Sequence, residues 1–246
     1  MVSTVLELTN AGKAYGGGRR VLSAFDFRLS SGELVVVLGR SGSGKSTLIK
    51  VLAGLENLDE GTVTWQTDSE RPKIGVVFQQ PALIPWLSVR ENIALGARFG
   101  ATSGRFDFRY AASLLERFGL EVFADRYPDE LSGGQAQRVA VIRAAAIQPD
   151  ALLLDEPFSA LDPAVRSDCQ EWLAELSKEL GCSVVLVTHD VDEALRLGDR
   201  IVLLGPDGST SREWRLNGAL QTETTRTEIL AEYREDAVED AHTGKR

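Results

Sequence analysis

The residues best suited to chemistry form a glycine-rich loop that begins at Gly39. It reads GRSGSGKS and is followed by Thr47, which satisfies the pattern G-x4-G-K-[ST]. Glycines let the backbone turn tightly so that successive N–H groups face phosphate oxygens, and Lys45 adds a positive charge toward the β- and γ-phosphates. The Ser46 hydroxyl can ligate Mg²⁺. The residues expected to contact a nucleotide are Gly39, Ser41, Gly42, Ser43, Gly44, Lys45, Ser46 and Thr47.

Two adjacent carboxylates follow a second apolar run, which reads ALLLDEP over residues 151–157. Because neighbouring residues on a strand point to opposite sides, Asp155 and Glu156 are expected to do different jobs. In an enzyme with a phosphate loop, the first carboxylate holds Mg²⁺ and the second is placed to polarise a water in line with the γ-phosphate. The alternative is an acidic loop without chemistry.

A histidine, His189, follows a third apolar run in the sequence VVLVTHD. A lone histidine is more often structural than catalytic. This one lies at the predicted carboxyl end of a strand, which is where α/β proteins bind ligands, so we expect it to contact the γ-phosphate.

The elements that must position these residues alternate between strands and helices. Near-continuous apolar runs predict buried strands, and amphipathic segments between them predict helices, which together indicate an α/β sheet. The predicted strands are 34–38, 74–78, 152–154 and 183–187, and the predicted helices are 46–55, 163–180 and 192–196.

Three further regions complete the chain. Residues 87–147 read as several helices without a buried strand, which predicts an inserted helical lobe. The first 30 or so residues alternate more loosely and predict an antiparallel strand pair. After Gly218 the chain becomes polar and acidic, and we expect a short peripheral helix with a frayed end.

Composition argues against several classes of function. The formal net charge of −9 disfavours nucleic acid as a partner. Cys169 and Cys182 lack metal-like or C-x-x-C spacing, so we expect two reduced, partly buried thiols, with a disulfide as the alternative. The N-terminus shows no secretory signal, and every apolar run is far shorter than the ~20 residues needed to cross a bilayer.

A second glycine motif, LSGGQ at residues 131–135, precedes another helix-like stretch. A hydroxyl and exposed amides before a helix make a second anion site, although one phosphate loop already serves one triphosphate. With the phosphate loop before it and LLLDEPFSALD after it, this motif resembles the ATP-binding subunit of ABC transporters over about residues 1–217.

The resemblance implies a fold and a set of domains. The fold is an α/β P-loop NTPase (RecA-like) core with an N-terminal antiparallel β subdomain and an inserted helical subdomain. The ATP-binding domain would span 1–218, with the helical subdomain at about 87–147 and an acidic C-terminal tail at 219–246.

The resemblance also implies roles for individual residues. Tyr15 corresponds to the aromatic that stacks on adenine, Gln79 to the glutamine that reaches Mg²⁺ and the attacking water, and Glu156 to the general base. Lys45 and His189 complete the catalytic set, and the metal ligands are Ser46, Gln79 and Asp155. In a head-to-tail pair of such subunits, expected to be two copies of this chain, a second set closes over the partner's ATP: Ser132, Gly133, Gly134, Gln135 and Asp162.

The stretch FQQPALIPWLSVRENIALG distinguishes among members of the family. It is similar to the pattern of importer ATPases for nitrate, taurine and aliphatic sulfonates, whereas SALDP also occurs in thiamine and polyamine importers. The implied function is ATP hydrolysis that powers import of a small anionic solute from the cytoplasmic face of the membrane. The implied partners are transmembrane permease subunits and, indirectly, a solute-binding protein. An exporter subunit, or a soluble ATPase of DNA repair or translation, is the alternative.

Overall fold

The structure is a computed structural model that describes residues 3–16, 19–67, 72–99, 106–216 and 222–242. The chain forms two compact units. One comprises Met1–Gln66 together with Ser183–Arg246, and the other comprises Thr67–Cys182. None of the helices in the described ranges is both long and apolar enough to cross a membrane.

The first unit begins with a three-stranded antiparallel sheet in the order β2-β1-β4. The strands are β1 (Thr4–Tyr15), β2 (Arg19–Ser30) and β4 (Glu60–Trp65). Alternating apolar residues such as Leu6 and Leu8 turn inward and are buried. The predicted antiparallel pair is therefore confirmed, and β4 adds a third strand that the sequence pattern did not predict.

The same unit contains a second sheet built on β3 (Leu34–Gly39), which pairs in parallel with β7 (Ser183–Thr188) and β8 (Arg200–Leu204). The strand β9 (Thr210–Arg215) runs antiparallel to β8. Every residue of β3, β7 and β8 is buried, as the apolar runs at 34–38 and 183–187 predicted for β3 and β7, whereas β8 was not among the predicted strands.

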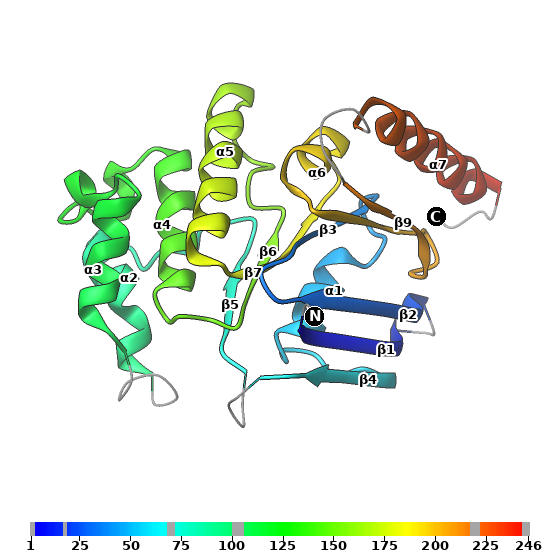
Figure 1. The fold of residues 1–246 in the computed structure, drawn as a ribbon, viewed down its shortest axis with the longest axis horizontal. Helices are drawn as coiled ribbons and strands as arrows, with labels where there is room; N and C mark the ends of the chain where they lie inside the picture. The colour runs from blue at the N-terminus through cyan, green and yellow to red at the C-terminus, as the bar shows by residue number, and fades with distance from the viewer. Residues whose placement is uncertain (1–2, 17–18, 68–71, 100–105, 217–221, 243–246) are drawn as a thin grey trace. The chain divides into compact units, whose positions relative to one another are not determined.

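Three helices belong to this unit: α1 (Lys45–Leu52), α6 (Val191–Leu197) and α7 (Thr222–His242). The last helix lies beside β9 and α6 (Figure 1). It has 21 residues, so the prediction of a C-terminal helix is confirmed and the prediction that it is short was wrong; the end of the chain, residues 243–246, lies outside the described residues. The physical reason is docking, because Ile229 is fully buried and several ion pairs hold the helix.

The second unit pairs β5 (Ile74–Val77) with β6 (Ala151–Asp155) in parallel. The remaining elements are helical, and α4 packs between α3 and α5 (Figure 1). Between residues 87 and 147 the described residues contain helices and turns but no strand. The helices in this range are α2 (Val89–Ile93), η1 (Ala94–Arg98), α3 (Phe108–Arg117), η2 (Glu121–Phe123), η3 (Pro128–Glu130) and α4 (Gly133–Ala145). The helix α5 (Pro163–Leu180) follows β6 in the same unit.

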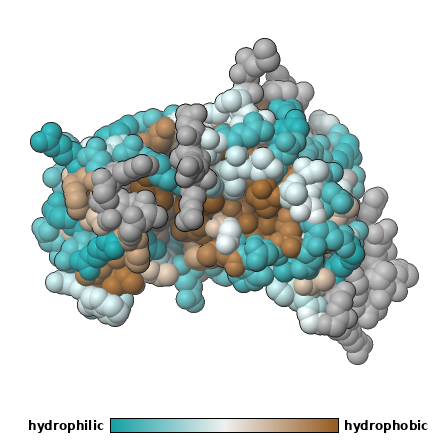
Figure 2. Space-filling view, turned by 90° about the horizontal axis from the view of Figure 1, so that it is seen from below, coloured by the Kyte–Doolittle hydropathy of each residue, from teal (hydrophilic) through white to brown (hydrophobic). Residues whose placement is uncertain are grey.

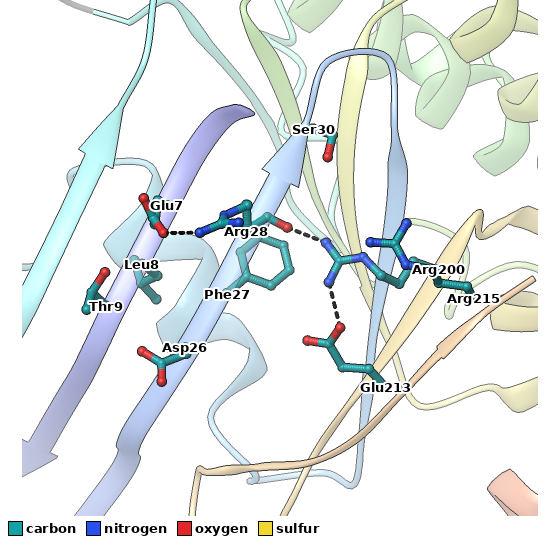
Figure 3. A pocket seen from close by; sticks show the side chains of 10 residues that line it. All are labelled: Glu7, Leu8, Thr9, Asp26, Phe27, Arg28, Ser30, Arg200, Glu213 and Arg215. Atoms are coloured by element: carbon teal, nitrogen blue, oxygen red, sulfur yellow. Dashed lines mark hydrogen bonds and ion pairs between the residues drawn. The ribbon is translucent and has the colours of Figure 1, made fainter. Parts of the chain in front are cut away.

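A buried guanidinium joins the two sheets of the first unit. Arg200 on β8, whose side chain is 5% exposed, pairs with Glu33 at 2.8 Å and with Glu213 at 3.0 Å. It also donates to the backbone carbonyl of Arg28 on β2. Figure 3 shows Arg200, Glu213 and Arg28 in the wall of a pocket of about 400 Å³ between the two sheets. Because Arg28 pairs in turn with Glu7, the buried charge lies in a connected polar network.

We expect Arg200→Met to destabilise the protein, because it leaves the half-buried Glu33 carboxylate without its cation. Removing one partner of a buried pair costs about 3 kcal/mol or more, measurable by urea unfolding. Replacing the exposed Arg20, which pairs with Glu60 at 2.8 Å, by Met is the matched control and should cost less than about 1 kcal/mol. Equal losses in the two variants would contradict the assigned role of Arg200.

The loss should also depend on pH. Burial of Glu33 raises the pKa of its carboxyl, but bonds from Arg200 and from the Ser30 amide outweigh this and leave the pKa below its usual value. A depressed folded-state pKa stabilises the protein above the unfolded-state pKa, and that stabilisation is lost as pH falls through the folded-state value. The difference in the free energy of unfolding between wild type and Arg200→Met should therefore become smaller in acid and be fully present at neutral pH.

Candidate nucleotide-binding site

The phosphate loop connects β3 to α1 in the first unit. Gly44 is the N-cap of α1 and has φ +105°, and Gly42 has φ +86°. Lys45, 4% exposed, donates from Nζ to the carbonyl oxygens of Gly39 at 2.8 Å and Arg40 at 2.9 Å. The ammonium is thus held inside the turn of the loop, where the amides at the start of α1 also lie.

One buried hydroxyl of the loop is unsatisfied. The Ser43 side chain is 5% exposed, and its Oγ has no hydrogen-bond partner among the described residues. A Cβ built on Gly39 would lie 2.6 Å from this oxygen, so the loop closes around it. A buried polar atom without a partner is unfavourable, and a phosphate oxygen is a suitable partner for a hydroxyl donor. Ser41 and Ser46 lie at the exposed mouth of the loop.

His189 and the phosphate loop follow neighbouring parallel strands. Leu38 pairs with Thr188, so the residues after β3 and after β7 emerge at the same sheet edge. His189 is exposed, and the turn that carries it is held by the Asp190 amide, which donates to Thr188 Oγ1 at 3.1 Å. Tyr15 ends β1, is 39% exposed, and has the Lys13 ammonium 5.5 Å from its ring centroid.

Gln79 and Asp155 lie at the carboxyl ends of neighbouring parallel strands of the second unit. Val77 of β5 pairs with Leu154 of β6, which brings the two strand ends to one edge. Asp155 is the last residue of β6 and is 9% exposed, whereas Gln79 is exposed.

Glu156 differs from the sequence expectation in its backbone. The strand ends at Asp155, and Glu156 adopts a left-handed conformation with φ +45°. Asp155 therefore belongs to the strand and Glu156 to the turn that follows it. The alternation of side chains along a strand does not apply to this pair of carboxylates. The turn is closed by Ser159, whose hydroxyl donates to the Glu156 carbonyl at 2.9 Å. A non-glycine residue in this region is strained, and such strain clusters at functional sites.

The LSGGQ motif forms the start of α4. Ser132 is the N-cap: its Oγ accepts from the Gln135 amide at 3.3 Å, and the Gln135 side chain accepts from the Ser132 amide at 2.9 Å. Gly133 is exposed, whereas Gly134 is buried, and a Cβ on Gly134 would lie 2.5 Å from Val165 of α5. The second glycine is therefore required for helix packing.

Asp162 is the N-cap of α5, and its side chain accepts a hydrogen bond from the Val165 amide at 3.1 Å. Its carboxylate thus has a structural role within its own chain.

Residues 78–88, which carry the proline-bracketed run, are held by side chains that sequence reasoning missed. Arg143 of α4 donates to the Pro81 and Ala82 carbonyls at 2.8 Å each, and burial lowers the pKa of its guanidinium. The amide of Asn92, fully buried, donates to the carbonyls of residues 84, 87 and 88 and accepts from the amide of residue 84. Trp86 remains 74% exposed on this braced turn. Asn92 follows Arg90 and Glu91 in the sequence, so its polarity gave no sign that it is buried.

The two cysteines are free and buried, as predicted. Burial raises the pKa of the Cys182 thiol to about 11 and also raises the pKa of Cys169. Both thiols are therefore protonated at neutral pH and carry no chemistry of the site.

Comparisons with known proteins bear on the identity of this site. The family model for ABC transporters matches residues 22–159. The aliphatic sulfonates import ATP-binding protein SsuB 1 of Pseudomonas savastanoi pv. phaseolicola is 41% identical over 230 residues, 94% of this chain and 93% of that protein. The sulfate/thiosulfate import ATP-binding protein CysA of Bordetella parapertussis is 43% identical over 209 residues, 81% of this chain and 59% of that protein. The solved dimer of the ATP-binding cassette MJ0796 with ADP and Pi has a TM-score of 0.71 and 38% identity, over 87% of this chain and 100% of that one.

The buried parallel strands and the glycine loop before α1 define a P-loop nucleoside triphosphatase. The matched family model and the relatives narrow this class. The chain belongs to the ABC transporter family, and it is an ATP-binding cassette with ATPase activity.

We expect Gly44→Ala to impair nucleotide binding. An added Cβ would lie 2.2 Å from the Val21 carbonyl oxygen, so the loop or β2 must shift. We expect the affinity for a fluorescent ATP analogue to fall at least ~10-fold, or ~1.4 kcal/mol, in equilibrium titration. Gly54→Ala is the matched control, because Gly54 also has a positive φ (+69°) but no atom within 4 Å of an added Cβ. Unchanged affinity in Gly44→Ala would overturn this account of the loop.

Proposed function

We propose that this chain is the ATP-hydrolysing subunit of an ABC importer for a small anionic solute of the aliphatic sulfonate type. The observation that carries this proposal is the match to an aliphatic sulfonates import ATP-binding protein over nearly the whole length of both chains. The sulfate/thiosulfate relative is equally similar in sequence, but more than a third of its length lies outside the match. Sulfonate is therefore the better supported solute.

The first unit provides the proposed nucleotide contacts. Lys45 and the amides of the phosphate loop bind the phosphates, Tyr15 stacks on adenine, and His189 contacts the γ-phosphate. The unsatisfied Ser43 hydroxyl and the buried Lys45 ammonium support an anion in the loop. The remaining loop contacts are those of Gly39, Ser41, Gly42, Gly44, Ser46 and Thr47.

Mg²⁺ would be held by Ser46, Gln79 and Asp155. The described residues include no cluster of three or more His, Cys, Asp or Glu side chains that could hold a metal. This fits Mg²⁺ at a phosphate site, because that ion is bound through only one or two carboxylates, here Asp155, and completes its shell with other oxygens, phosphate and water. When bound, the ion neutralises phosphate charge and orients the phosphates.

In the proposed reaction, a water oxygen attacks the γ-phosphorus in line with the bridging oxygen. The new P–O bond forms as the bond to the bridging oxygen breaks, which releases ADP and phosphate. Glu156 accepts the proton of the attacking water, and Lys45 and His189 stabilise charge on the γ-phosphate oxygens. The strained backbone of Glu156 supports a functional role for its carboxylate.

We further propose that two copies of this chain pair, so that Ser132, Gly133, Gly134, Gln135 and Asp162 meet the nucleotide held by the partner. The dimeric form of the solved cassette supports this arrangement. ATP would favour the closed pair and hydrolysis would release it, which links two states to one phosphate.

The proposed surface for the permease includes Trp86. Figure 2 shows hydrophobic side chains that reach the surface in one view of the molecule. Exposed apolar side chains of the second unit are Phe78, Trp86, Phe99, Phe108, Val122 and Tyr127. Trp86 is the most notable, since a rigid turn presents it to solvent and an exposed tryptophan suits a binding surface. Such docking would hold the chain at the cytoplasmic face of the membrane. In this proposal the ATP-binding domain spans 1–218, with its helical lobe at 87–147, and the tail spans 219–246.

We expect Glu156→Gln to lower the steady-state ATPase rate by ~10²–10⁴-fold, because it removes the general base. Nucleotide binding should persist, and the dimer should accumulate with ATP in size-exclusion chromatography. Glu175→Gln is the control, since Glu175 is an exposed carboxylate on α5. A phosphate-release rate near that of wild type in Glu156→Gln would rule out this role.

We expect Trp86→Ala to reduce stimulation of the ATPase by the permease and its solute-loaded binding protein in proteoliposomes. Loss of a central aromatic contact should lower the ratio of stimulated to basal rate by ~10-fold or more. Val122→Ala, which truncates another highly exposed apolar side chain of the same unit, is the control. If both variants keep the wild-type ratio, the turn around Trp86 does not dock the permease.

A further inference from the structure

The C-terminal helix α7 contacts the turn that carries His189. The Tyr233 hydroxyl donates to the His189 backbone carbonyl at 3.4 Å. Two helical turns earlier, the Arg226 guanidinium pairs with Asp192 at 2.8 Å, and the fully buried Ile229 lies between these two contacts in sequence. The helix therefore touches both the turn and the first residues of α6.

The helix α7 is also bound to β9. Arg212 binds Glu228 and Glu232 at 3.1 Å each, and the Trp214 indole donates to Glu228 at 3.1 Å. Glu228 therefore accepts from two side chains of one strand. Because α7 is fixed to β9 as well as to α6, it can restrain the His189 turn.

The His189 turn also makes hydrogen bonds to its neighbours in sequence. The Asp190 amide donates to Thr188 Oγ1, and the Asp190 carboxylate caps α6 by accepting from the amides of Asp192 and Glu193 at 2.9 and 3.1 Å. These bonds lie within a span of six residues. The bonds from α7 come from more than 30 residues away, so they tie the turn to a part of this unit that is distant in sequence.

We propose that α7 positions His189 for turnover, with Tyr233 and Arg226 as positioning residues that act through the His189 backbone and through Asp192. The inference rests on the proposed contact between His189 and the γ-phosphate. It assigns the acidic C-terminal segment a role in the ATPase cycle. Nucleotide affinity should depend little on α7, because Lys45 and the phosphate loop are held by their own bonds.

The first test is kinetic and compares Tyr233→Phe with Thr227→Ala. Thr227 lies on the same helix, and its hydroxyl bonds only within α7, to the Glu223 carbonyl at 3.0 Å. We expect Tyr233→Phe to lower kcat by ~3–10-fold, the effect of one lost hydrogen bond, and to leave KM for ATP within ~2-fold. Arg226→Met should act in the same direction, Arg226→Lys should restore part of the rate, and Thr227→Ala should match wild type.

The second test observes His189 itself. The chain has two histidines, His189 and His242, so a His242→Gln variant labelled with ¹³C-histidine has one imidazole signal. We expect Tyr233→Phe to shift or broaden that signal and to change its response to a non-hydrolysable ATP analogue. Thr227→Ala should leave the signal in place.

Two outcomes would overturn the inference. One is an unchanged His189 signal and kcat in Tyr233→Phe. The other is a lower kcat together with a lower melting temperature but an unmoved His189 signal, since that pattern means that α7 only stabilises the fold. The proposed catalytic role of His189 fails separately. It fails if the His189→Ala variant hydrolyses ATP at the wild-type rate while, in the chain that retains His189, the imidazole signal still responds to Tyr233→Phe.

Discussion

The backbone carbonyl of Val21 in β2 lies so close to two glycines that neither position has room for a side chain. A Cβ on Gly44 would lie 2.2 Å from this oxygen, and one on Gly208 would lie 2.3 Å from it. Gly44 ends the phosphate loop, and Gly208 lies in the turn between β8 and β9, where its carbonyl accepts from the Ser23 amide at 3.0 Å. The antiparallel sheet thus packs backbone to backbone against the loop. Since Tyr15 lies on the strand that pairs with β2, the separation of Tyr15 from the phosphate loop is set by backbone contact.

The turns that carry other site residues are held by side chains that bind backbone carbonyls. Arg143 binds two carbonyls at 81–82, Asn92 binds those of the next turn, and Tyr233 binds that of His189. Carbonyls outside helices and strands need partners from elsewhere, and long polar side chains supply them. This arrangement makes the positions of the turns at 81–82 and at His189 depend on helices that are distant in sequence, whereas Asn92 holds a turn close to it in the chain.

Local patterns predicted several features that depend on neighbouring residues, although β4, β8 and β9 were not predicted. The loop, the buried strands and the helical character of the lobe followed from glycine spacing and hydrophobic periodicity, because these features are set within ten or so residues. What failed depended on residues far apart. The docking of α7 requires Arg212 and Asp192, and neither was identifiable from an acidic segment that resembles a solvated tail. The turn at Glu156 failed for another reason, since the strand ends one residue before an alternation argument needs it to continue.

The two kinds of restraint suit different parts of an ATP-driven cycle. The phosphate loop is fixed by steric contact at Gly44 and by a lysine that is 4% exposed, interactions that cannot be loosened without disrupting the fold. The His189 turn is held instead by a long hydrogen bond and by an ion pair whose side chains are 48% and 70% exposed. Such exposed interactions contribute little free energy each and are made and broken at low cost. A rigid loop that binds phosphate and a histidine turn that can shift are what an enzyme requires if it must bind ATP in both states but hydrolyse it in only one.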